Sequence, residues 1–279
     1  MSTLAPPTAA DPTAPAPPHR WRHLPRDAAT MTGRALRLVR RDPEELLVSL
    51  LLPIMIMVLF VYVFGGAVQV GTDYVTYATP GVILLCAGYG ASNTAVAVTD
   101  DMSGPAMDRF RSMSLAGATV LAGHVVASVA KNLVTTTVVL LAAVAIGFRP
   151  DAGALEWLAV AGVITAYVLA VTCVAALVGV VVRTPAAAGG LGFVMLFLPY
   201  VSSAFVPPET MPVWLRGFAE HQPVTPVIET LRGLLVGLGS DAAPATDLAP
   251  TAAIALLWCA GIAGVALSAA AWVFARRRG

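Results

Sequence analysis

The amino-acid sequence predicts an all-α integral membrane protein with six transmembrane helices, preceded by an amphipathic helix at the membrane surface. Two observations predict this fold class. Of the 279 residues, 57% are hydrophobic and only 12% are charged, against roughly 25% charged residues in an average soluble domain. The apolar residues are also gathered in long blocks, and the mean hydropathy is +0.78. A chain with so little charge could not cover its own surface in water.

The first 30 residues predict a disordered cytoplasmic tail, because a proline-rich segment without apolar periodicity cannot bury enough surface to become ordered. The tail lacks the apolar core of a signal peptide. From Met31 to Arg41, basic residues fall on one side of a helix and apolar residues on the other, which favours a helix lying among lipid headgroups. The alternative is a cytosolic extension of the first span. The basic side is formed by Arg34, Arg37, Arg40 and Arg41.

The transmembrane domain is predicted over residues 31–276. Its first helix has a start signal, since Asp42 can cap it and Pro43 suits the first helical position. Six apolar stretches follow, each long enough to cross a bilayer with about 20 helical residues. The predicted spans are residues 46–68, 78–99, 119–147, 157–182, 186–206 and 250–274.

The arginines set the predicted orientation. With both termini in the cytoplasm, thirteen arginines lie on the cytoplasmic side and three lie outside, namely Arg149, Arg216 and Arg232. Because cytoplasmic loops carry an excess of basic residues, this asymmetry predicts a multi-pass protein of the cell membrane with both termini cytoplasmic.

Two of the connections between predicted spans have helix-like sequence patterns that simple loops lack. The cytoplasmic connection Asp100–Leu115 contains a helical pattern whose bulky apolar side chains lie beside charged ones, which is typical of a docking segment. The alternative is an interfacial helix whose apolar side chains enter lipid. The outer segment Pro207–Ala249 contains an apolar run, Val227–Leu238, that is too short to span and predicts a re-entrant or surface-lying helix. The docking pattern comprises Met107, Asp108, Arg109, Phe110, Arg111 and Met113.

Several kinds of chemistry are excluded. The single lysine, Lys131, follows Val129 and Ala130 rather than glycine, so the chain has no P-loop for ATP. No predicted span contains Asp or Glu, which argues against a proton- or sodium-coupled carrier. No catalytic or metal-binding pattern is present, and nothing predicts a nucleic-acid partner. The three cysteines are expected to be buried in separate spans, where they act as small apolar residues: Cys86, Cys173 and Cys259.

The polar residues within the spans are mostly neutral. Lys131 is expected to extend to the cytoplasmic interface, and His124 to be solvated there. Neutral polar side chains usually join helices, or they could line a path for a bulky, mostly apolar substrate. The same aromatic residues could instead face lipid. The residues predicted for this path are Phe60, Phe64, Asn93, Phe193, Phe197 and Tyr200.

Three stretches resemble one protein family. They are Arg40-Arg41-Asp42-Pro43 with the apolar run through Gly66, the connection at residues 100–117, and the outer segment from Met211 to Leu234 with its Glu229-Thr230-Leu231-Arg232-Gly233 sequence. Together they resemble the permease subunits of ABC-2 exporters, in particular daunorubicin-resistance-like drug and antibiotic exporters. The likeness covers about residues 31–276. The sequence Ser114-Leu115-Ala116 departs from it, because the family's coupling loop usually has a proline there.

The resemblance implies a separate nucleotide-binding ATPase subunit and a second permease, either an identical copy or a homologue. ATP and magnesium would be used by the partner, and this chain would hold no cofactor. The pattern from Met107 to Met113 would receive the ATPase, and the outer segment would form a gate with Trp214, Pro226, Glu229 and Arg232.

Other function classes remain as alternatives, namely an ion- or proton-coupled carrier and a structural subunit of a membrane complex. Within the exporter interpretation, an aromatic content of 7% favours a lipophilic drug, antibiotic or lipid over a polysaccharide as the substrate.

Overall fold

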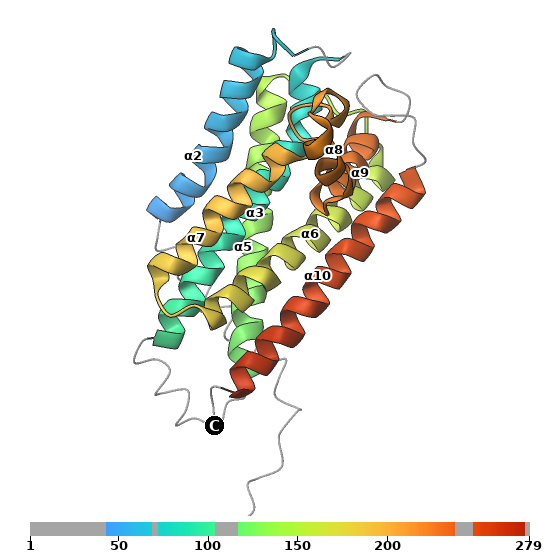
Figure 1. Cartoon of the computed structure of the whole chain (residues 1–279). Helices are drawn as coiled ribbons and strands as arrows, with labels where there is room; N and C mark the ends of the chain where they lie inside the picture. Colours follow the sequence, from blue (N-terminus) through green and yellow to red (C-terminus); the bar gives the residue numbers. More distant parts are fainter. Residues whose placement is uncertain (1–42, 69–71, 104–116, 238–247, 277–279) are drawn as a thin grey trace, which may run out of the picture.

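A computed structural model describes residues 43–68, 72–103, 117–237 and 248–276. The predicted tail, the four arginines of the amphipathic helix and the docking pattern Met107–Met113 lie outside the described residues. The described part is helical and contains no strand, as the apolar blocks predict. The long helices lie side by side and run along the long direction of the molecule (Figure 1).

Five helices are long and apolar enough to cross a membrane, and a sixth apolar helix, Pro185–Val201, is shorter. The described elements in chain order are α2 (Pro43–Leu59), the π-helical turn η2 (Phe60–Phe64), α3 (Tyr74–Ser103), α5 (Gly117–Ile146), α6 (Ala154–Val181), α7 (Pro185–Phe197), the 3-10 turns η3 (Leu198–Val201) and η4 (Pro208–Thr210), α8 (Val213–His221), α9 (Val224–Val236) and α10 (Leu248–Arg276).

Each predicted span overlaps these helices, but three ends differ. The first span was predicted to continue to residue 68, but its helical residues end at Phe64. The fifth span was predicted to continue to Val206, but its helix ends at Val201. There the Ser202 hydroxyl donates to the backbone oxygen of Pro199 and accepts from the backbone N–H of Ala204, which stabilises a turn in place of another helical turn. The second span continues to Ser103, so Asp100 and Asp101 belong to α3 rather than to the following connection.

Helix α3 is the centre of the bundle, since it packs against α5, α6 and α7 and also touches α2 and α9. Glycine allows the closest approaches. A Cβ on Gly81 would lie 2.5 Å from the Cβ of Ala204, and one on Gly179 would lie 2.7 Å from the backbone oxygen of Ala95. Small residues at such crossings let helices pack closely in lipid. In helices α2 and α10, by contrast, only 17% of the apolar stretch is buried.

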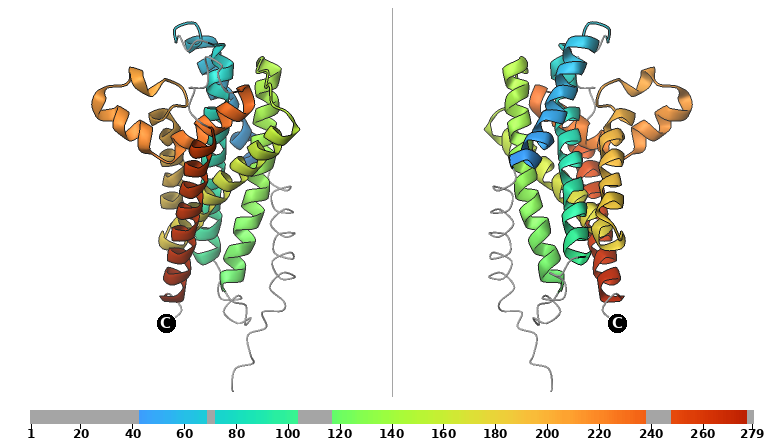
Figure 2. Two further views of the ribbon diagram at one scale, coloured as in Figure 1. Left: turned by 90° about the vertical axis from the view of Figure 1, so that its right-hand side faces the viewer. Right: turned by 90° about the vertical axis from the view of Figure 1, so that its left-hand side faces the viewer.

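Helix α9 is buried on nearly all sides and packs against α3, α6 and α10. The prediction for this apolar run was a re-entrant or surface-lying helix, and the structure shows it packed inside the helical bundle. The three long helices cover most of its side chains. Helix α8, in contrast, projects from the side of the bundle (Figure 2). Both α8 and α9 lie toward the end opposite the C-terminus (Figure 1).

Candidate functional site

The guanidinium of Arg232 joins three parts of the fold at the predicted outer end. Its side chain is buried in α9, and Nη2 donates to the backbone oxygens of Ser203 at 2.7 Å and Tyr77 at 3.2 Å. The guanidinium also lies 3.9 Å from the centroid of the Tyr77 ring. A buried charge requires such compensation, so Arg232 fixes α9 to the start of α3 and to the turn after η3. Nearby, the Tyr74 hydroxyl donates to the backbone oxygen of Phe205 at 2.9 Å.

Glu229 precedes Arg232 on α9 and is partly buried. Burial raises the pKa of its carboxyl group, the positive charge of Arg232 opposes this shift, and the negative charges of Glu209 and Glu220 add to it. Burial also lowers the pKa of Arg232, although a guanidinium stays charged in proteins. The outer end therefore combines a fixed positive charge with a carboxylate that is costly to ionise.

Three of the four residues predicted for the outer gate lie on α9, whereas Trp214 lies on α8 with 79% of its surface exposed. Pro226 and Arg232 are buried and Glu229 is partly buried. Trp214 thus differs from the other three in being exposed. Sequence reasoning missed Tyr77 and Ser203 as partners of Arg232, because both contribute backbone oxygens that no side-chain pattern reveals.

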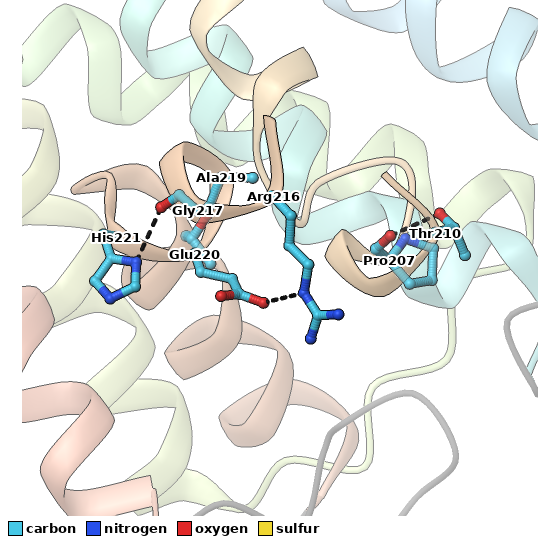
Figure 3. A network of polar contacts seen from close by, with 8 residues as sticks. Pro207, Thr210, Arg216, Gly217, Ala219, Glu220 and His221 are labelled. Carbon is cyan, nitrogen blue, oxygen red and sulfur yellow. Dashed lines mark hydrogen bonds and ion pairs between the residues drawn. The ribbon is translucent and has the colours of Figure 1, made fainter. Parts of the chain in front are cut away.

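The short elements of the outer segment are held by local contacts (Figure 3). On α8, Arg216 pairs with Glu220 at 2.7 Å and Nδ1 of His221 donates to the backbone oxygen of Gly217. This pairing raises the pKa of Arg216. Two further bonds tie the C-terminal end of α8 to the bundle: Gln222 donates to the backbone oxygen of Val201, and Thr225 to that of Ala219.

An aromatic cluster lies beside this segment, where η2 meets η3. The Phe60 ring stacks on Phe205 with centroids 4.3 Å apart, and Tyr200 lies 5.0 Å from Phe205. Phe64 and Phe197 adjoin the cluster at 5.2 Å from Phe60 and 6.0 Å from Tyr200. Four of the predicted path residues therefore come together.

Phe205 was not predicted for this cluster. It lies in the predicted fifth span, but the turn at Ser202 brings its ring back against Tyr200. The two remaining path residues lie elsewhere: Phe193 projects from α7 with 68% of its surface exposed, and Asn93 is partly buried on α3.

The predicted cytoplasmic end contains one unexpected contact. His124, predicted to be solvated, instead lies on α5 with Nε2 2.7 Å from Oδ2 of Asp101 on α3. The prediction was wrong because it placed Asp101 in a loop, whereas α3 extends far enough to present the carboxylate to α5. Lys131 lies further along α5 and is partly buried.

An apolar cavity of about 560 Å³ lies between α6, α9 and α10. This volume falls within the range of small-molecule pockets. Its lining includes Gly162, Val163, Thr230, Leu234 and Leu256.

The described residues offer little that could hold a metal. They contain no group of three or more His, Cys, Asp or Glu side chains placed around a common point. The three cysteines are buried free thiols, as predicted.

Comparison with known proteins agrees with this architecture. The sequence model of the family described as "ABC-2 type transporter" matches residues 27–236. This chain belongs to the ABC-2 type transporter family. The match includes α2 to α9, and therefore both the Arg232 contacts and the aromatic cluster.

Two curated relatives cover most of the chain. The chain is 28% identical over 214 residues to the "Daunorubicin resistance ABC transporter permease protein DrrB1" of Streptomyces coeruleorubidus, covering 75% of this chain and 76% of the relative. It is also 28% identical over 236 residues to the "Probable doxorubicin resistance ABC transporter permease protein DrrC" of Mycobacterium tuberculosis, covering 83% and 82%. This ABC-2 protein is a multi-pass membrane permease without its own ATPase site, and membership of the family implies a separate ABC ATPase.

Proposed function

We propose that this chain is the permease of an ATP-driven exporter that moves a lipophilic drug, antibiotic or lipid out of the cell. Family membership supports the ATP-driven mechanism, and the names of the two relatives support a drug or antibiotic as the substrate. The structural observation that supports a lipophilic substrate is the aromatic cluster around Phe60 and Phe205. Clustered rings with few hydrogen-bonding groups suit an apolar or ring-bearing compound.

Energy would enter from the cytoplasm. The arginine asymmetry supports cytoplasmic termini, and this orientation puts Arg34, Arg37, Arg40, Arg41 and the segment Met107–Met113 on the side of the ATPase. Closure of two ATPase subunits around ATP and magnesium would push on these segments and tilt the spanning helices as rigid bodies. No cofactor is assigned to this chain in the proposal.

A second permease, identical or homologous, would complete the pathway. The exposed apolar side chains of α2 and α7 support this part of the proposal, because a facing copy would cover them. Lipid would cover the remaining apolar surface. The side chains concerned include Leu51, Met55, Phe193 and Phe197, each more than half exposed.

The first experiment is purification of a tagged copy in mild detergent, followed by mass spectrometry of the proteins that accompany it. A P-loop ATPase should co-purify. Liposomes containing both proteins should accumulate a fluorescent anthracycline only when ATP is supplied, and liposomes with this chain alone should respond neither to ATP nor to an ion gradient. Gradient-driven uptake by the lone chain would contradict the proposal and favour a coupled carrier.

A second experiment tests the cytoplasmic docking segment. The double charge reversal Arg109→Glu with Arg111→Glu should abolish ATP-dependent export while the lone permease still folds. Arg278→Glu, which reverses a charge at the C-terminus of the same chain, serves as the control. Equal export by the double variant and by Arg278→Glu would contradict a docking role for Arg109 and Arg111.

A further inference from the structure

Polar contacts join α3 to α5 at three levels. Deepest in the bundle, Nδ2 of Asn132 donates to the backbone oxygen of Ala87 at 2.6 Å. One level nearer the predicted cytoplasmic end, the hydroxyls of Thr94 and Ser128 are hydrogen-bonded to each other. The third contact is the pair of Asp101 and His124. The contacting α5 residues are spaced four apart, so they lie along one face of that helix.

The third contact lies at the end of this helical hairpin where the chain passes from α3 to α5. Asp101 lies in the last turn of α3, which ends at Ser103, and His124 lies two turns into α5, which begins at Gly117. Their side chains are only 35% and 24% exposed, and the two atoms are 2.7 Å apart. A hydrogen bond to a carboxylate is among the stronger ones, and partial burial reduces its screening by solvent.

Helix packing alone does not account for this pair. The two contacts above it already hold α3 and α5 together, and Asn132 also packs against Gly90. An apolar pair could hold the helix ends together with a smaller cost of desolvation. A directional bond at this level instead fixes how the two helix ends are placed relative to each other.

We propose that Asp101 and His124 are positioning residues for energy coupling, and that their bond makes α3 and α5 move as one unit when the ATPase pushes on the cytoplasmic side. This inference rests on the proposed function. Without the bond the two helix ends separate under load, and ATP is hydrolysed without a matching movement of the spans. The effect acts through the helices, and neither residue contacts substrate or nucleotide.

The test uses the purified complex of this chain with its ATPase in liposomes, and it measures anthracycline export and ATP hydrolysis in the same sample. Asp101→Ala and His124→Ala should leave ATP hydrolysis near the wild-type rate and lower export per ATP by about five-fold or more, the lower limit of typical coupling between sites. His124→Gln, which keeps a hydrogen-bond donor, should recover most of the export. Asp100→Ala is the matched control, because Asp100 is the exposed neighbouring carboxylate on the same helix.

Other outcomes overturn the inference. Export per ATP that is unchanged in both alanine variants, or lowered equally by Asp100→Ala, would do so. A lower melting temperature with normal export per ATP would show a purely structural role. Should the single variants fail to fold, the exchanged pair Asp101→His with His124→Asp restores the bond, and normal export per ATP is then expected. A wild-type complex that does not export at all would contradict the proposed function itself. That result can be distinguished from a failure of the coupling role alone.

Discussion

The guanidinium of Arg232 lies 3.9 Å from the centre of the Tyr77 ring while donating a hydrogen bond to the backbone oxygen of the same residue. One arginine thus uses both its charge and its plane to hold a short outer helix against the central helix of the bundle. A planar guanidinium can stack on a ring while its N–H groups donate hydrogen bonds, whereas an ammonium group has no plane to stack.

Replacing Arg232 by leucine should therefore lower the free energy of unfolding by about 2–4 kcal/mol, because two buried carbonyl oxygens lose their donor. Lysine should give a smaller loss, since it keeps the charge but cannot stack on Tyr77. Thermal unfolding of the detergent-purified chain measures both variants. Arg216→Leu is the control, because Arg216 forms an exposed ion pair with Glu220, and such pairs contribute little. Equal melting temperatures for the two leucine variants would contradict the anchoring role.

Gly179 and Gly162 should respond in opposite ways to alanine. A Cβ at Gly179 would meet the backbone oxygen of Ala95 at 2.7 Å and the side chain of Val98 at 2.8 Å, whereas a Cβ at Gly162 meets nothing within 4 Å. Both lie on α6, so helix propensity favours alanine equally, by about 0.5–1 kcal/mol. We expect Gly179→Ala to lower stability by about 1–3 kcal/mol and Gly162→Ala to leave it unchanged or raise it, as measured by thermal unfolding. Equal tolerance of the two changes would show that α3 and α6 can separate freely.

Truncating the aromatic cluster should weaken recognition of a ring-bearing substrate. Phe60→Ala and Tyr200→Ala each remove stacking contacts, so the substrate concentration for half-maximal export should rise about 2- to 10-fold, the equivalent of one aromatic contact. Tyr200→Phe keeps the ring and should behave like the wild type. Trp258→Ala, which removes a partly exposed ring on α10, is the control. Unchanged half-maximal concentrations in both cluster variants would exclude a role in substrate binding.

The stability of the outer segment should depend on the ionisation of Glu229. Because burial raises its pKa in the folded protein, protonated Glu229 favours folding, and this contribution is lost as the pH rises from the unfolded pKa, about 4.3, through the higher folded value. Glu229→Gln mimics the protonated form. It should raise the melting temperature at pH 7.5, and the difference from wild type should shrink as the pH falls toward about 4. A variant that is less stable than wild type at pH 7.5 would show that Arg232 needs the carboxylate charge.

Much of the fold follows from composition alone. The apolar blocks predicted an all-helical membrane protein, and the described part of the chain is helical without strands. The last predicted span, residues 250–274, lies within α10. These features depend on local hydropathy, which is a property of short stretches of chain.

The site was less predictable, because its contacts join distant parts of the chain. Arg232 was named from its sequence motif, but its acceptors at Tyr77 and Ser203 are backbone oxygens. Phe205 joins the aromatic cluster only because the fifth span stops short at a turn. Hydropathy does not predict that turn, because Ser202 and Ser203 could equally well lie within an apolar helix.

The amino-acid sequence by itself determined that this protein crosses a membrane and that the given chain has no P-loop. The side that its termini face stays a prediction from the arginine asymmetry. Those properties depend on the hydropathy and charge of short stretches of chain and on a local sequence motif. Only the tertiary structure decided that α9 is buried, that Trp214 is exposed while Arg232 is not, and that His124 contacts Asp101. These features depend on which helices lie next to each other. A pattern of apolar residues predicts that a helix face is buried, but it does not predict which helix covers that face.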